Sequence, residues 1–274
     1  MNARDKTVAG GITITIVIAI VVWSVLIPPE PTYGGKPLTA WAEQYGSNHW
    51  SNVDRAADRE AEFAIRRIGT KAIPFLLDLI QAKDSILKKR LRSLVPQKWH
   101  QRLGIDGTSG QTRRIGAHGL AALGTNAPTA VPTLIEFANR HPDEDGRYIA
   151  FFALRTLGLA AESAIPLFIQ GLTNDVSIIR DEAAICLGGM HHRPEIVVPN
   201  LIQYLKFAKS SSSSFECTDA VGLLGKFGTN AKASVPIMIE LLEHSNPSVR
   251  LEATNWLPRI DPEAAANAQV KRAW

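Results

Sequence analysis

A glycine followed eight residues later by a proline recurs at near-constant spacing through most of this chain. The clearest copies begin at Gly124, Gly158 and Gly228. Aligning the chain on this glycine gives six equivalent positions, spaced 55, 34, 33, 37 and 33 residues apart: Gly69, Gly124, Gly158, His191, Gly228 and Asp261. Such a period is typical of a solenoid, in which each unit buries its apolar face only against its neighbours.

Each unit is predicted to contain two helices, one on either side of this anchor position. Before the anchor, apolar residues such as Ala150, Ala153 and Leu157 recur in steps that place them on one helical face. Glycine suits the left-handed conformation past a helix end, and proline suits the first turn of the next helix. Small residues recur in the first helices and allow close packing: Ala61, Ala150, Ala183, Ala220 and Ala253. The pattern predicts an all-α fold, an α-solenoid of about six helix pairs.

Two segments resemble HEAT repeats, in the short bacterial form also seen in phycobilisome-lyase-like proteins. They are Ala117 to Pro132 (AHGLAALGTNAPTAVP) and Ser248 to Leu257 (SVRLEATNWL). The resemblance covers residues 54–266 and implies stacked helix pairs whose second helices line the concave side. It concerns scaffold residues only, so it implies no active site.

Three units depart from the pattern. The first has only five residues from Gly69 to Pro74, and the fourth has His191 in place of glycine. The last unit stops after Asp261-Pro262, and we expect it to lack a full second helix. Atypical terminal units are expected because they must cap the core.

Val8 to Ile27 is an unbroken stretch without charged residues. Twenty helical residues span about 30 Å, the thickness of a bilayer core. Residues 1–30 are therefore expected to be an N-terminal signal-anchor, whose one transmembrane helix, Val8 to Ile27, stays uncleaved and precedes the solenoid. A cleaved signal peptide is the alternative, but no small-x-small cleavage site follows the segment.

The orientation of this anchor follows from its flanking charges. Arg4 and Lys6 precede it, and the positive-inside rule places them in the cytoplasm. The repeats would then be extracytoplasmic, in a periplasm. Cys186 and Cys217 lie at different heights in adjacent units, so we expect two buried, unpaired thiols. Free thiols fit a reducing compartment better, which leaves a cytoplasmic-facing solenoid open as an alternative.

Residues 31–53 are expected to form a linker with a short amphipathic helix. Thr39 can cap that helix, with Trp41, Ala42 and Tyr45 on one side. We interpret it as a cover for the exposed end of the first repeat; a docking motif is the alternative.

The solenoid is expected over 54–266, with a C-terminal tail over 267–274 and a basic insertion near 85–111. The insertion accounts for the long first interval, and its basic residues far outnumber its acidic ones. It can contact anionic lipid, nucleic acid or an acidic partner; the alternative is a solvated excursion with Trp99 packed inward. The candidate binding residues in it are Lys88, Lys89, Arg90, Arg92 and Trp99.

No catalytic, cofactor or metal site is predicted. No histidine is followed by glutamate, and His191-His192, the one histidine cluster, has no partner at ligand spacing. The chain has neither a Gly-x-Ser-x-Gly elbow nor a phosphate-binding loop. An enzyme or lyase-like accessory protein remains the alternative to a non-catalytic scaffold.

A polar row is predicted along the second helices, at the fourth and seventh positions after each proline. The fourth positions are Asp78, Glu136, Gln170, Gln203 and Glu240. The seventh positions are Gln81, Asn139, Thr173, Lys206 and Glu243. Unpaired charge is costly to bury, so we expect this second-helix row to face solvent and to bind a protein partner. Its four acids and one base argue against nucleic acid.

Overall fold

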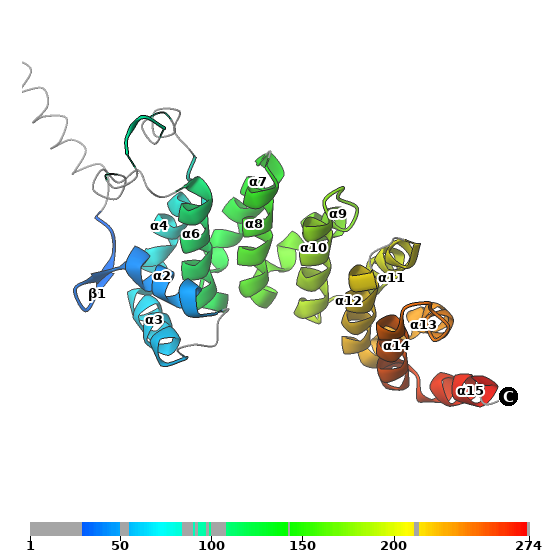
Figure 1. The fold of residues 1–274 in the computed structure, drawn as a ribbon. Helices are drawn as coiled ribbons and strands as arrows, with labels where there is room; N and C mark the ends of the chain where they lie inside the picture. The colour runs from blue at the N-terminus through cyan, green and yellow to red at the C-terminus, as the bar shows by residue number, and fades with distance from the viewer. Residues whose placement is uncertain are drawn as a thin grey trace, which may run out of the picture.

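The computed structural model describes residues 29–49, 55–83, 90, 93–96, 99, 108–141, 143–210 and 214–272. Within them, the predicted repeat region is built from helices stacked side by side (Figure 1). The first helices are α3 (Arg55–Ile68), α6 (Ser109–Leu123), α8 (Glu144–Thr156), α10 (Ser177–Met190), α12 (Ser214–Lys226) and α14 (Pro247–Ile260). The second helices are α4 (Ala72–Ile80), α7 (Val131–Arg140), α9 (Ile165–Gly171), α11 (Pro194–Ser210), α13 (Val235–Leu241) and α15 (Pro262–Arg272). The predicted α-solenoid is confirmed.

The anchor turns form as the glycine and proline pattern predicts. Gly69, Gly124, Gly158 and Gly228 all have positive φ, between 54° and 68°. His191 also has a positive φ, of 49°, without being a glycine, but its ψ of 31° makes it left-handed helical, whereas Gly124 has a ψ of −136°. Short 3-10 helices follow the anchors in four units: η1 (Gly69–Lys71), η3 (Gly124–Asn126) with η4 (Pro128–Ala130), η5 (Gly158–Ala164) and η6 (Gly228–Ser234). Proline stands in the first turn of α7, α9 and α13.

One continuous apolar core runs along the stack, from Leu38 to Ala268. The small residues predicted to allow close approach are fully buried in it: Ala61, Ala150, Ala183, Ala220 and Ala253. Each first helix contacts the first helix of the next unit, as α6 does with α8 and α8 with α10. The stability of each unit therefore depends on its neighbours.

The segment before the first unit is part of the fold. Thr32–Tyr33 (β1) and Lys36–Pro37 (β2) form an antiparallel hairpin that turns at two positive-φ glycines. Helix α2 (Leu38–His49) follows and packs against both α3 and α6. Its expected apolar face is present, since Trp41 and Ala42 are buried.

Two details of the segment at 31–53 differ from expectation. Thr39 lies inside α2 and does not cap it. Its amide instead donates to Oε1 of Glu30 at 2.6 Å, so the Glu30 side chain accepts from the first turn of the helix. The helix also packs beyond the first repeat, because the ring of His118 on α6 lies against Gly46. Leu38, Trp41 and Ala42 of this stretch belong to the apolar core, so helix α2 is packed into the fold.

The C-terminal boundaries also differ from expectation. Helix α15 (Pro262–Arg272) gives the last unit a second helix that packs against α14. It runs through the expected boundary at 266, so most of the predicted tail over 267–274 is helical. The expected end of the insertion at 111 lies inside α6, whose first turn is closed by a capping box between Thr108 and Gln111.

The predicted anchor, Val8 to Ile27, lies outside the described residues. Among the helices that the structure describes, none combines the length and apolar character needed to cross a bilayer.

Candidate functional site

The second-helix row is exposed to solvent in all five units. Every fourth-position residue, from Asp78 on α4 to Glu240 on α13, is exposed to solvent. The seventh-position residues are exposed as well; Gln81 directly follows α4, and Thr173 and Glu243 come two residues after the ends of α9 and α13. Figure 1 shows the second helices α7, α9, α11 and α13 following one another along one side of the stack. The predicted solvent exposure of this row is confirmed.

The row is less acidic than its sequence indicates. Glu136 pairs with Arg140 one turn further along α7, at 2.6 Å. Glu240 pairs with Lys209, which reaches across from the end of α11 in the preceding unit. The hydrogen bond from Lys209 lowers the pKa of Glu240 below its ordinary value. These bases offset two of the four acids, so the expectation of an acidic stripe that repels phosphate loses much of its force.

Two hollows border the row where successive second helices meet. One, of about 560 Å³, lies between α4 and α7 and is lined by Gln81, Glu136 and the ring of Phe137. A smaller one, of about 90 Å³, lies between α7 and α9 and is lined by Asn139 and Gln170. Row residues therefore form the rims of depressions that can accept side chains of a bound chain.

The structure describes part of the basic insertion. Arg90 is exposed, and the Trp99 side chain is 43% exposed. Lys88, Lys89 and Arg92 lie outside the described residues.

Three arginines that the sequence analysis did not single out tie the units together. Arg113, Arg180 and Arg250 all stand eleven residues before an anchor position. Their side chains donate to carbonyl groups of the loop that ends the preceding unit, namely those of Ala82, Asn174, Asp175, His244 and Ser245. Arg147 occupies the same position in the third unit without a described bond of this kind, and Cys217 occupies it in the fifth, so the offset is only an incomplete signal.

Buried ion pairs add further links between neighbouring first helices. Arg180 on α10 contacts Glu216 on α12 at 2.6 Å, and Arg155 on α8 contacts Glu182 on α10 at 2.6 Å. Burial raises the pKa of Glu182 above its ordinary value, although Arg155 acts in the opposite direction. Because each pair is satisfied internally, these carboxylates have a structural role.

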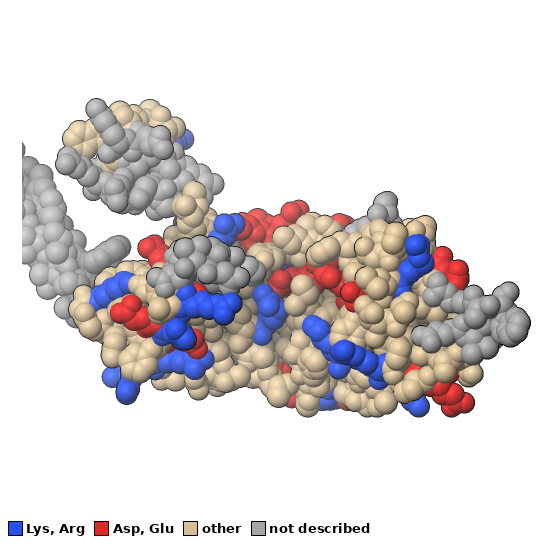
Figure 2. All heavy atoms as spheres, turned by 60° about the horizontal axis from the view of Figure 1, so that its bottom comes forward, with Lys and Arg blue, Asp and Glu red and all other residues tan. Residues whose placement is uncertain are grey.

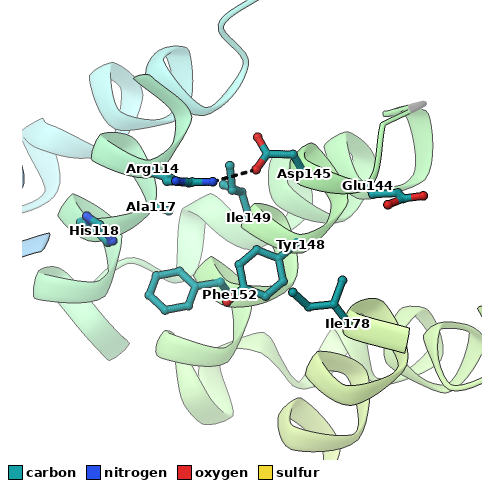
Figure 3. Close-up of a pocket in the computed structure, with 9 residues that line it drawn as sticks. All are labelled: Arg114, Ala117, His118, Glu144, Asp145, Tyr148, Ile149, Phe152 and Ile178. Atoms are coloured by element: carbon teal, nitrogen blue, oxygen red, sulfur yellow. Dashed lines mark hydrogen bonds and ion pairs between the residues drawn. The ribbon is translucent and has the colours of Figure 1, made fainter. Parts of the chain in front are cut away.

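Another pocket that sequence reasoning missed lies among the first helices α6, α8 and α10 (Figure 3). Its volume is about 540 Å³, and Tyr148, Phe152 and Ile178 form an apolar part of its wall. Arg114 and Asp145 pair across its upper rim at 3.3 Å. Burial raises the pKa of Tyr148, so this phenol stays protonated at neutral pH and is a poor base.

The cysteines and the His191-His192 pair have surroundings that fit a role in packing. Cys186 and Cys217 are buried free thiols, as expected, and burial raises the pKa of both. His191 stacks on Phe227, and His192 lies 3.3 Å from Glu162. The described residues contain no group of three or more side chains placed to hold a metal ion.

Comparison with known proteins bears on the fold. No protein-family model and no curated protein matches the chain. The structure is similar to that of Kap121p, with a TM-score of 0.57 and 13% identity over 85% of this chain and 26% of that one. An engineered protein (TM-score 0.49, 16% identity, 84% of this chain and 97% of that one) also matches. A designed armadillo repeat protein in complex with the peptide (KR)4 matches with a TM-score of 0.46 and 12% identity, over 84% and 98%. The chain has an armadillo/HEAT-like helical-repeat fold.

Proposed function

We propose that this chain is a membrane-tethered, non-catalytic scaffold that binds a protein partner along the second-helix row. The observation that carries the proposal is the regularity of the row: ten polar positions in five successive units are all exposed, beside hollows. Solenoids use such extended surfaces for recognition. A repeated surface suits a partner with an extended segment that meets one unit after another.

The chemistry of the row favours a polypeptide over a highly charged polymer. Gln81, Asn139, Gln170 and Gln203 present amide groups, each of which can both donate and accept hydrogen bonds. Main-chain groups of an extended peptide need partners of both kinds. The hollow beside Phe137 adds an apolar wall for an anchoring side chain, which the row otherwise lacks.

The tether is supported by the sequence of Val8 to Ile27, which is long enough to span a bilayer and bears no charge. Arg4 and Lys6 favour an extracytoplasmic, periplasmic solenoid. A reporter that works only outside the cytoplasm, fused after Trp274, tests this orientation. An inactive fusion at normal expression would reverse the orientation, and a mature N-terminus beyond Pro28 would show cleavage.

The test of the row is a triple charge reversal: Glu136→Lys, Glu240→Lys and Glu243→Lys. Its matched control reverses three exposed acids off the row: Glu43→Lys, Glu60→Lys and Asp175→Lys. Partners are captured with each full-length variant from solubilised membranes and quantified by mass spectrometry. We expect the row variant to lose partners that the control retains, while both keep their helical circular dichroism. Equal recovery with both variants would exclude the row as the binding surface.

The basic insertion is tested separately as a second contact. Deleting it would endanger Thr108, which caps α6, so point substitutions are preferable. The variant replaces Lys88, Lys89, Arg90 and Arg92 with Ser and Trp99 with Ala. If the insertion contributes affinity, recovery falls; unchanged recovery would restrict binding to the row.

A further inference from the structure

A groove of about 790 Å³ lies where the chain enters the fold, between the N-terminal strand region and the first repeat. Pro29 and Pro31 form one side, and Ile68, Phe75 and Leu79 of the first helix pair form the other. These three apolar side chains are half-buried and pack against the core from outside. We call this depression the entry groove. Its volume lies within the range of small-ligand sites.

Two cations without carboxylate partners lie at the entry groove. Arg67 and Lys71 are exposed and line it, one helical turn apart in sequence. No described carboxylate lies within ion-pair distance of either; the Arg67 guanidinium lies over the Phe63 ring at 5.1 Å. Asp78 lines the same groove and is also without a described ion-pair partner. The entry groove therefore combines an apolar wall with two cations and one anion for which the described residues provide no ion-pair partner.

The position of the entry groove along the chain indicates what it meets. Ile27, the last residue of the uncharged segment, stands two residues before Pro29. In the tether proposed above, on which this inference rests, Pro29 leaves the bilayer at the level of the headgroups. In Figure 1 the chain enters the fold beside the first repeat, and Figure 2 shows Lys and Arg at this end of the body with Asp and Glu among them.

We propose that the entry groove binds a phospholipid from the surrounding bilayer whose headgroup carries both a phosphate and an ammonium, as in phosphatidylethanolamine. Arg67 and Lys71 bind the phosphate, because guanidinium and ammonium groups form charge-assisted hydrogen bonds with it. Asp78 accepts from the ammonium. The upper part of an acyl chain lies along Ile68, Phe75 and Leu79. The first repeat is thereby held against the membrane surface.

The experiment uses the full-length protein in lipid nanodiscs that contain a phosphatidylethanolamine with a photoreactive group at the start of one acyl chain. After irradiation, labelled peptides are mapped by mass spectrometry. We expect label on the peptide that contains Ile68, Phe75 and Leu79, in addition to the peptide that contains Val8 to Ile27. Label on the second peptide alone would overturn the groove proposal but keep the tether. Label on neither would remove the tether itself.

A pair of variants tests the cations. Arg67→Ala/Lys71→Ala removes both, and Arg55→Ala/Arg59→Ala removes two exposed cations from the same helix outside the groove. A basic residue near a lipid surface contributes about a five-fold change in affinity. We therefore expect groove labelling to fall about 25-fold in the first variant and to stay near the wild-type level in the second. Equal labelling in both would contradict phosphate binding by Arg67 and Lys71.

The headgroup is tested by a second probe, a phosphatidylglycerol with the same photoreactive chain, which lacks the ammonium. Wild-type protein should label several-fold more strongly with the ethanolamine probe, and Asp78→Asn should abolish that preference. Equal or greater labelling of wild-type protein by phosphatidylglycerol would overturn the assignment of Asp78. Circular dichroism of each variant confirms that the fold is retained.

Discussion

Arg180 on α10 holds the carboxylate of Glu216 on α12 through two nitrogens, with Nη2 at 2.6 Å and Nε at 3.1 Å from the same oxygen, Oε1. The same guanidinium donates to the carbonyl groups of Asn174 and Asp175, at the end of the third unit. One side chain thus connects three successive units. The Glu216 side chain is only 1% exposed, so Arg180 is the counter-ion that makes its burial tolerable.

Replacement of Arg180 by Met should therefore be strongly destabilising. It leaves a buried carboxylate without its counter-ion, and breaking such a pair costs about 3–5 kcal/mol. The double variant Arg180→Met/Glu216→Leu should recover part of that loss, because neither charge remains. Urea unfolding of the full-length protein in mild detergent, followed by circular dichroism, measures both. Arg193→Met, which breaks solvated pairs with Glu162 and Glu195, is the control and should have little effect. If the double variant proves no more stable than Arg180→Met, the unpaired charge of Glu216 is not the cause of the lost stability.

The anchor turns predict opposite effects for two glycines. Gly158 has φ of 57°, where an alanine is strained, so Gly158→Ala should cost about 1–2 kcal/mol. Gly189 is helical, and a methyl group there would meet nothing within 4 Å. Gly189→Ala should stabilise by about 0.5–1 kcal/mol, because alanine loses less conformational freedom on folding. Thermal unfolding measures the melting temperatures of the two variants. A shift of the same sign for both would contradict the predicted opposite effects.

The anchors also show why the solenoid was predictable from sequence. A left-handed turn strongly prefers glycine, and a helix start tolerates proline, so these two residues report local backbone geometry directly. His191 lacks this signal and its ψ differs from that of Gly124, but it also ends its helix with a positive φ, and its ring stacks on Phe227. The row was predictable for a related reason: polar residues at a fixed offset from each proline share one helical face.

Features that depend on contacts between distant segments were not predictable in this way. The packing of α2 on α6 depends on Gly46 meeting His118, a contact across many intervening residues. Helix α15 lacks the apolar run that marked other second helices, yet Ala265 and Ala268 bury their small side chains against the preceding unit. The pairing of Glu240 with Lys209 joins two units and is invisible within either one.

Asp143 should make stability dependent on acid pH. Its Oδ1 caps α8 by accepting from the Gly146 amide at 2.6 Å, and Arg113 lies nearby. Partial burial opposes ionisation of Asp143, but the hydrogen bonds from Gly146 and Arg113 outweigh it and hold its pKa below the ordinary 3.8. A lowered folded-state pKa contributes stability that is present above the unfolded value and is lost as pH falls through the folded one.

Two substitutions separate the cap from the charge at this position. Asp143→Asn keeps a capping oxygen but cannot titrate, so its stability should fall less than that of wild type between pH 5 and the acid limit of the measurement. Asp143→Ala removes the cap as well and should cost about 1 kcal/mol at pH 7. Melting temperatures of the three proteins across this pH range provide the check. An Asn variant with the acid dependence of wild type would show that other groups dominate.

The thiols should be inert while the fold is intact. Cys186 is buried and its Sγ lies 3.5 Å from the carbonyl oxygen of Phe151, while burial raises the pKa of Cys217 to about 11. Because the thiolate is the reactive form, a disulfide reagent at pH 8 should label neither residue in the native protein and both in urea. If labelling in low urea reaches Cys217 before Cys186, the fifth unit opens locally before the fourth. This order is expected because Cys217 stands where Arg180, in the fourth unit, bonds the preceding loop. Simultaneous labelling of both thiols would instead show that the units open together, and rapid native labelling of either would contradict the buried environments assigned to them.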